Sequence, residues 1–279
     1  MAGDPIRLKE CGLMVEKLSF DVLASWADNL VPVAEKAGQA ILEVRSRGFD
    51  VLKKDDASPV TEADRIAEGI VVAELERLAP SIPIVAEERV AGGEVPDLKG
   101  DSFWLVDALD GTKEFIKNGT DFTVNIALVY NGVPVFGIVH APAREETFVG
   151  FVDSETGQRK AEVSRKGESK AISVRARPEQ VIVAGSRSHE VADEMDAFLS
   201  KYQVGDRIVI GSSLKFCLVA EGKADFYPRF GPTCEWDTGA GHAVLRAAGG
   251  RVHDFDGAEM PYKKAPTFLN GRFLADGGP

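Results

Sequence analysis

Residues 102–112 read SFWLVDALDGT, an apolar strand that runs into two aspartates and a glycine. Asp107 and Asp110 stand three residues apart where the predicted strand ends, so both carboxylates can face one space. Carboxylate oxygens, together with a loop carbonyl such as that of Leu109, are hard ligands that suit Mg²⁺. Gly111 lets the backbone approach a ligand, and a helical turn opening there offers free N–H groups to a phosphate. Taken alone, the segment is more typical of an ordinary turn, because Asp and Gly favour turns.

A second acidic pair, Glu87 and Glu88, follows the short apolar strand predicted at residues 83–86. Neighbouring side chains on an extended chain point to opposite sides, so we expect only Glu87 to face the site. Two more acids, Asp64 and Asp237, stand at predicted helix starts, where an acidic residue is typical of a cap. Each acid alone is typical of a cap or of a solvated edge. Together they mark junctions between elements, where sites on α/β scaffolds usually lie.

The hydrophobic pattern divides the chain into an N-terminal extension at residues 1–18 and two halves. Residues 19–175 predict helices, the first of them interrupted at Pro32, and then antiparallel strands with a hairpin at Asn131-Gly132. Residues 176–279 alternate short strands and helices. We therefore expect a mixed α/β (α+β) fold, in which an antiparallel-sheet half is followed by an α/β half without a flexible linker.

The composition is that of a globular protein of one or two domains, with 279 residues, 44% of them hydrophobic and 28% charged. A total of 33 basic and 44 acidic residues gives a net charge of −11, which makes the chain a poor candidate for a non-specific nucleic-acid binder, because such a protein needs a basic surface. Three cysteines without a CxxC pattern disfavour a disulfide framework and a structural zinc site, and they fit a reducing compartment. Without a membrane-spanning apolar run or a signal-peptide pattern, we expect a cytoplasmic protein, with peripheral membrane association left open.

Patterns that indicate other chemistries are absent from the sequence. The four histidines lack metal-ligand spacing, and there is no GxGxxG or phosphate-binding P-loop pattern. The segment SRSH at residues 186–189 suggests a serine nucleophile, but no nucleophile-elbow pattern surrounds it.

In combination, the acidic segments resemble the inositol monophosphatase superfamily of Mg²⁺-dependent, Li⁺-sensitive phosphatases. The family pattern D-P-[IL]-D-G-[ST] reads DALDGT at residues 107–112, and its WD…AG segment reads WDTGAG at residues 236–241. The family's Glu-Glu and Thr-x-x-Asp signatures match at residues 87–88 and 61–64. Ala108 stands where the family has proline, a change that affects loop stiffness rather than ligand chemistry. The resemblance covers about residues 20–275 and implies a layered αβαβα sugar-phosphatase fold.

The resemblance also implies the roles of individual residues. It makes Asp64 and Thr112 the pair that positions and deprotonates the attacking water. Two or three Mg²⁺ ions would be held by carboxylates and one backbone carbonyl. These implied metal ligands are Glu87, Asp107, the carbonyl of Leu109, Asp110 and Asp237.

Finer features are similar to the bacterial 3′(2′),5′-bisphosphate nucleotidase branch of the superfamily, notably SPVT at residues 58–61, SRSH at 186–189 and GSSLKFC at 211–217. Enzymes of that branch convert adenosine 3′,5′-bisphosphate (PAP) to AMP and phosphate, which supports sulfate assimilation. Lys215 offers a point charge to a second phosphate, and Arg229 is a similar candidate. The substrate contacts implied are Glu87, Leu109, Asp110, Gly111, Thr112, Ser186, His189, Gly211, Ser212, Lys215, Arg229 and Asp237.

Three alternatives stand beside this hypothesis. One is an inositol monophosphatase or a broad sugar-phosphate phosphatase, which needs no pocket for a second phosphate. Another is a regulatory protein that binds metal and phosphate without turnover, which the presence of Asp64 and Thr112 disfavours. A phosphoinositide-active membrane-surface protein is disfavoured by the net charge of −11. We expect a small-molecule nucleotide substrate, no nucleic-acid partner, and a monomer or a homodimer.

Overall fold

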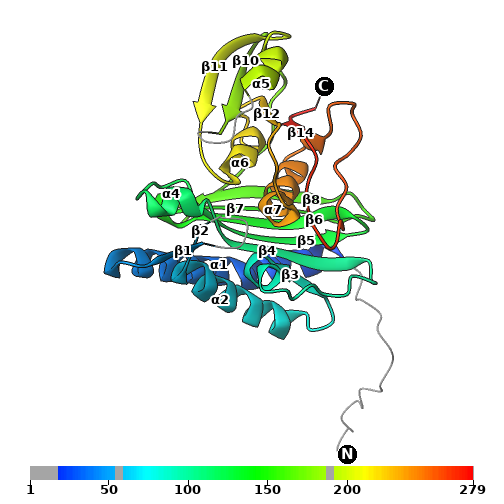
Figure 1. The fold of residues 1–279 in the computed structure, drawn as a ribbon. Coiled ribbons are helices and arrows are strands. Elements are labelled where there is room, and N and C mark those ends of the chain that lie inside the picture. The colour runs from blue at the N-terminus through cyan, green and yellow to red at the C-terminus, as the bar shows by residue number, and fades with distance from the viewer. Residues whose placement is uncertain (1–17, 54–58, 187–191, 279) are drawn as a thin grey trace, which may run out of the picture.

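The computed structural model describes residues 18–53, 59–186 and 192–278. Its elements stack in five layers, with helices outside and between two sheets (Figure 1). The predicted mixed α/β fold and its αβαβα layering are thereby confirmed. The helices are α1 (Phe20–Arg47) and α2 (Glu62–Leu78) in one outer layer, α6 (Leu214–Ala220) and α7 (Glu235–Ala247) in the middle layer, α5 (Ala192–Leu199) in the other outer layer, and the short α3 (Glu87–Ala91), α4 (Thr112–Ile116) and 3-10 turn Pro142–Arg144 in connections.

Helix α1 begins after Ser19, whose hydroxyl accepts a hydrogen bond from the N–H of Val22, and it ends at Gly48 with φ of 80°. The predicted interruption at Pro32 is wrong, because α1 is continuous through that residue. An apolar stripe along α1 packs on α2 and on the first sheet. The burial of this stripe outweighs the single backbone hydrogen bond that proline cannot donate.

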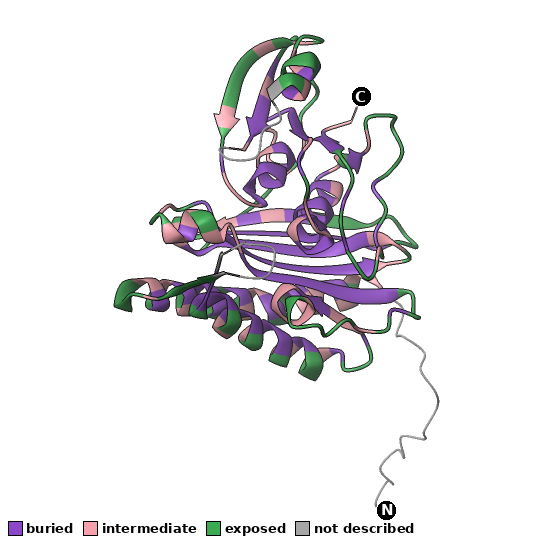
Figure 2. Cartoon of the chain, viewed as in Figure 1, coloured by how far each residue is buried: buried purple, intermediate pink, exposed green. Residues whose placement is uncertain are grey.

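The first sheet has seven strands, of which only β3 and β4 pair in parallel. Helices cover both of its faces, so the central strands are buried along nearly their whole length (Figure 2). The predicted hairpin is confirmed, with φ of 52° at Asn131 and 75° at Gly132, as a tight turn between twisted strands requires. In spatial order the strands are β3 (Ile84–Ala86), β4 (Ser102–Asp110), β5 (Thr123–Tyr130), β6 (Val133–Ala141), β7 (Glu146–Val152), β8 (Arg159–Arg165) and β9 (Glu168–Ala171).

The second sheet is mixed, because β10 pairs in parallel with β11 and β12 while β14 pairs antiparallel with β12 and β13. Its strands in spatial order are β11 (Gln203–Val209), β10 (Gln180–Gly185), β12 (Phe226–Arg229), β14 (Phe273–Asp276) and β13 (Arg251–His253). A separate hairpin pairs β1 (Val51–Lys53) with β2 (Pro59–Thr61). The division into residues 19–175 and 176–279 stays a prediction, and most of the predicted extension at residues 1–18 lies outside the described residues. No helix in the described ranges is long and apolar enough to cross a membrane.

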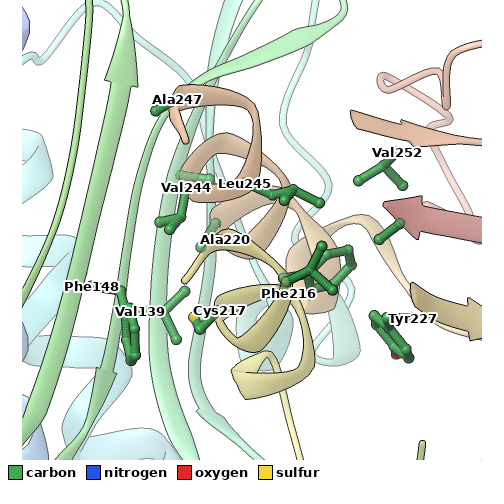
Figure 3. Close-up of a cluster of buried hydrophobic side chains, with 14 of the residues drawn as sticks. Val139, Phe148, Phe216, Cys217, Ala220, Tyr227, Val244, Leu245, Ala247 and Val252 are labelled. Carbon is green, nitrogen blue, oxygen red and sulfur yellow. The ribbon is translucent and has the colours of Figure 1, made fainter. Parts of the chain in front are cut away.

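One apolar core joins the two sheets through α6 and α7 (Figure 3). It runs from Val139 and Phe148 on the first sheet through Phe216 on α6 and Val244 on α7 to Val252 on the second sheet. This continuity fixes the position of each sheet relative to the other.

Glycines on two strands let α7 lie close against the first sheet. A Cβ atom added at Gly137 of β6 would lie 2.4 Å from the carbonyl oxygen of Ala240. One added at Gly150 of β7 would lie 2.5 Å from the Cα of Val244. Both partners are helix backbone, so a larger side chain would push α7 off the sheet.

We predict that Gly150→Ala lowers the free energy of unfolding by about 1–3 kcal/mol, because an added methyl overpacks a rigid contact. Gly69→Ala is the control, since Gly69 lies exposed on α2 with no atom within 4 Å of an added Cβ. Alanine is the better helix former by about 1 kcal/mol, so the control should gain stability. Thermal unfolding of both variants checks this, and a Gly150→Ala protein as stable as wild type would contradict the close packing.

Candidate active site

A cavity of about 310 Å³ opens between the first sheet and the second half of the chain. Predicted site residues from distant parts of the sequence line it, including the acidic residues, Lys215 and Arg229. Asp64 lies behind this lining and touches it through Thr112. His189 lies outside the described residues. The predicted residues that line the cavity are Glu87, Asp107, Leu109, Asp110, Gly111, Thr112, Ser186, Gly211, Ser212, Lys215, Arg229 and Asp237.

Three carboxylates meet closely in this cavity. Oxygen atoms of Glu87, Asp107 and Asp237 all lie within 4.8 Å of one another. Asp107 comes from the end of β4 and Asp237 from the first turn of α7. Glu87 does lie in the cluster as expected, but the chain does not continue extended there, because Glu87 is the first residue of α3.

Burial and mutual repulsion make Asp107, Asp237 and the neighbouring Asp110 costly to ionise. Burial is the largest cause that raises the pKa of Asp107 well above its ordinary value, and the charges of Glu87 and Asp110 add to it. The pKa of Asp237 is raised in the same way by burial, Asp110 and Glu87. Burial also raises the pKa of Asp110, against the opposing charge of Lys215. The cluster therefore favours a bound cation.

The donor atoms fit a hard divalent cation. One oxygen of Asp107 accepts the N–H of Leu109 at 3.0 Å, and one oxygen of Asp237 accepts the N–H of Cys234 at 2.7 Å. Within the described residues, the second oxygen of each accepts no hydrogen bond, so it can serve as a ligand. Carboxylate and carbonyl oxygens without nitrogen or sulfur suit Mg²⁺ rather than zinc.

Asp64 is both a helix cap and a partner of Thr112. Its Oδ2 accepts hydrogen bonds from the N–H and the hydroxyl of Thr61, both at 2.7 Å. These bonds belong to a capping box, which confirms the predicted cap at this helix start. Its Oδ1 accepts the Thr112 hydroxyl at 3.2 Å, and that hydroxyl also lies 3.2 Å from the carbonyl oxygen of Leu109. Burial raises the pKa of Asp64, and the bonds from Thr61 oppose this shift. The carboxylate is thus a stronger proton acceptor than an exposed aspartate.

The two buried cations of the cavity, Lys215 and Arg229, are held by backbone carbonyls. Lys215 Nζ donates to the carbonyl oxygens of Ser212 at 2.6 Å and Ile210 at 3.4 Å. Burial lowers the pKa of Lys215 to about 8. The guanidinium of Arg229 donates to the carbonyl oxygens of Gly231 at 3.2 Å and Pro232 at 2.9 Å. Both side chains therefore have fixed positions in the cavity lining.

Two residues that join the acids were missed in the sequence. The N–H of Ser213 donates to Asp110 at 2.7 Å, and its hydroxyl donates to the carbonyl oxygen of Asp237 at 2.7 Å. Asn125 Nδ2 donates to the Ser213 hydroxyl at 3.0 Å and to Asp110 at 3.4 Å. A lone amide within the apolar strand TVNIALVY (residues 123–130) is a signal that could have revealed Asn125. Ser213 lies in the segment GSSLKFC (residues 211–217) that the family resemblance singles out, but nothing in that segment assigns it a role of its own.

The chain is similar to known proteins over nearly its whole length. The sequence model of the inositol monophosphatase family matches residues 23–277. The 3′(2′),5′-bisphosphate nucleotidase CysQ of Shigella flexneri is 46% identical over 249 residues, which cover 88% of this chain and 97% of that protein. The crystal structure of CysQ from Bacteroides thetaiotaomicron matches with a TM-score of 0.74 and 37% identity, covering 90% of this chain and 97% of that one. An inositol monophosphatase from Anabaena (Nostoc) sp. PCC 7120 matches with a TM-score of 0.70 and 26% identity, covering 92% of each chain.

We predict that Asp107→Asn stabilises the metal-free protein at high pH only. The pKa of Asp107 is raised in the folded state, so its contribution to stability is present below the unfolded pKa and is lost as pH rises through the folded pKa. In EDTA at about pH 8, Asp107→Asn should unfold several degrees above wild type, and at about pH 4 the two should be close. Thermal unfolding at the two pH values measures this.

The matched control is Asp28→Asn, which removes one negative charge from the exposed face of α1. It should change stability little at either pH. If Asp107→Asn and Asp28→Asn behave alike, the carboxylate cluster does not carry the repulsion assigned to it.

Proposed function

This chain belongs to the inositol monophosphatase family, and we propose that it hydrolyses the 3′-phosphate of adenosine 3′,5′-bisphosphate (PAP) to give AMP and phosphate. The similarity to proteins named 3′(2′),5′-bisphosphate nucleotidase supports this substrate. One observation carries the proposal. A single cavity is lined by a carboxylate cluster, in which Asp107 is buried and Glu87 and Asp237 are half-buried, and by two buried cations, Lys215 and Arg229. The carboxylates suit metal and a scissile phosphate, and the cations suit a second phosphate. Such an enzyme is a phosphoric monoester hydrolase that supports sulfate assimilation.

The family is metal-dependent, and the proposed ion is Mg²⁺, in two or three copies. The residues that would hold it are Glu87, Asp107, the carbonyl of Leu109, Asp110 and Asp237. When bound, Mg²⁺ would offset the repulsion among the carboxylates, polarise the phosphoryl oxygens and make water a better nucleophile. A carboxylate base alone supplies only about 10²–10⁴-fold acceleration, far less than phosphate monoester hydrolysis requires.

Asp64 and Thr112 would orient the attacking water and accept its proton. The Thr112 hydroxyl donates to Asp64, which leaves the hydroxyl oxygen able to accept a hydrogen bond from water. As the water oxygen bonds to phosphorus, a water proton passes to the Thr112 oxygen while the hydroxyl proton passes to Asp64. The bond between phosphorus and the 3′ oxygen breaks, and that oxygen takes up a proton from solvent to become the 3′ hydroxyl of AMP.

The second phosphate would be bound mainly by Lys215. Its ammonium has three donors, of which two are used by the carbonyl oxygens of Ser212 and Ile210. The third can reach a phosphate, and with a pKa of about 8 the side chain is charged at neutral pH. Arg229, Gly211 and the backbone at Ser212 would complete the contacts. Ser186 lines the cavity on the proposed nucleoside side, and a contact from His189 stays a prediction.

The proposed function is tested by phosphate release from PAP, inositol 1-phosphate and fructose 1,6-bisphosphate with Mg²⁺. We expect the highest kcat/KM on PAP, because inositol 1-phosphate has no second phosphate for the cations and fructose 1,6-bisphosphate has no nucleoside to lie along Ser186. Faster hydrolysis of inositol 1-phosphate would instead assign an inositol monophosphatase. Full activity after EDTA treatment, without added metal, would contradict the metal assignment.

We predict that Thr112→Val lowers kcat on PAP by about 10²–10⁴-fold with little change in KM, because the hydroxyl acts on the water rather than on bound phosphate. Thr112→Ser keeps the hydroxyl and should retain most of the activity. Steady-state kinetics with saturating Mg²⁺ measure both parameters. A rise in KM at unchanged kcat would contradict the proposed role.

We predict that Lys215→Met costs about 10- to 150-fold in kcat/KM on PAP, since a charge-assisted hydrogen bond contributes about 1.5–3 kcal/mol. On adenosine 3′-monophosphate, which lacks the second phosphate, the loss should be much smaller. Lys117→Met, an exposed substitution at the end of α4, is the control and should leave both rates unchanged. Equal losses on the two substrates would mean that Lys215 acts on the scissile phosphate or on the fold.

A further inference from the structure

Helix α3, which carries Glu87, has no cap of its own. The residue at its N-cap position is Ala86, whose methyl side chain cannot accept a hydrogen bond, so the first turn has no side-chain cap from its own segment. The first N–H groups of a helix lack partners within the helix and must find acceptors elsewhere. In α3 two of these acceptors come from a different element.

Glu68 of α2 supplies both acceptors. Its Oε2 accepts the N–H of Glu88 at 2.7 Å, and its Oε1 accepts the N–H of Arg89 at 3.1 Å. The Glu68 side chain is buried, with 6% of the residue exposed. Both carboxylate oxygens therefore hold backbone groups of the first turn of α3, so the orientation of that turn is tied to α2.

The same helix face also carries Asp64, one member of the proposed water-activating pair. Asp64 and Glu68 are four residues apart on α2, so they lie on one face in consecutive turns. Asp64 accepts the Thr112 hydroxyl, and Glu68 accepts the first amides of α3. Helix α2 thus fixes the separation between Thr112 and Glu87.

We propose that Glu68 is a positioning residue that holds the Glu87 carboxylate against Asp107 and Asp237 through the amides of Glu88 and Arg89. The inference rests on the proposed metal site. Positioning α3 in this way requires one acceptor for each of the two amides. A carboxylate provides two acceptor oxygens, whereas a glutamine side chain provides one. In Glu68→Gln the amide nitrogen would face a backbone N–H, and α3 would lose one of its two anchors.

The test is a titration of the substrate-free protein with Mn²⁺. The concentration of unbound Mn²⁺ is measured from its electron paramagnetic resonance signal. Glu68→Gln should weaken the tightest Mn²⁺ binding by about 10- to 100-fold, as loss of a group that orients a metal ligand does. Glu76→Gln is the matched control. Glu76 lies on the same helix and bonds the same Arg89, but through the exposed guanidinium at 3.0 Å. The control should bind Mn²⁺ like wild type.

A double-mutant cycle separates positioning from a general loss of structure. If Glu68 acts through Glu87, then Glu68→Gln should have no further effect on Mn²⁺ affinity in a Glu87→Ala background. Equal losses in both backgrounds would overturn the proposal, as would unchanged affinity in the single variant. Should Glu68→Gln fail to fold, Glu68→Asp, which keeps the charge but shortens the reach, is measured in the same cycle and is expected to give the same result.

These outcomes are distinct from those that test the proposed function. Mn²⁺ binding needs no turnover, so a wild-type protein that binds Mn²⁺ but leaves PAP intact would refute the substrate and leave the role of Glu68 standing. Tight Mn²⁺ binding that Glu68→Gln does not change would refute the positioning role alone.

Discussion

Like charges repel strongly when they are buried, and Glu87, Asp107 and Asp237 have oxygens within 4.8 Å of one another. Holding them together costs folding free energy that the surrounding protein must offset. The core that joins both sheets through α6 and α7 provides a rigid frame for this purpose. The cost is recovered when a divalent cation enters, so the same repulsion that destabilises the metal-free cluster makes cation binding favourable.

Backbone amides hold the acids in place, and several of the acids are helix caps at the same time. Asp64 closes the capping box at the start of α2, and Asp237 closes the one at the start of α7. In each case one carboxylate oxygen bonds the helix start while the other faces the site or its partner. A cap and a site residue are therefore not competing interpretations here. The N-terminal amides orient the carboxylate and lower the cost of keeping it charged.

Features that depend on local rules were predictable from the sequence. The hairpin at Asn131-Gly132 and the capping box at Thr61 follow from neighbouring residues and are present in the structure. The predicted helix interruption at Pro32 is wrong because the helix continues where its whole apolar stripe packs on the core. Local sequence rules do not take this packing into account. Glu87 does face the site as predicted, but the reason given for it, alternation along an extended strand, is wrong. The start of α3 orients this side chain instead.

The sequence did not reveal residues whose role depends on hydrogen bonds to distant parts of the chain. Asn125 lies within β5 of the first sheet and Ser213 in the turn before α6, and only folding brings them to Asp110. The gathering of acids from distant segments was foreseen through a family resemblance, because spacing alone fits caps and turns equally well. The assignment of roles to those residues stays a prediction.

The turn before α6 links the two charged parts of the cavity. Ser213 bonds Asp110 and the backbone of Asp237, while the neighbouring carbonyl of Ser212 holds Lys215. The amide of Gly211 in the same turn donates to Asp121 at 3.3 Å. A phosphate bound by Lys215 would thus lie at a separation from the carboxylate cluster that one short turn determines. Fixed separation favours a substrate whose two phosphates match it, since misplacing the reacting group by about 1 Å can cost about 10²-fold in rate. Selectivity for a bisphosphate and alignment for hydrolysis would then come from the same hydrogen bonds.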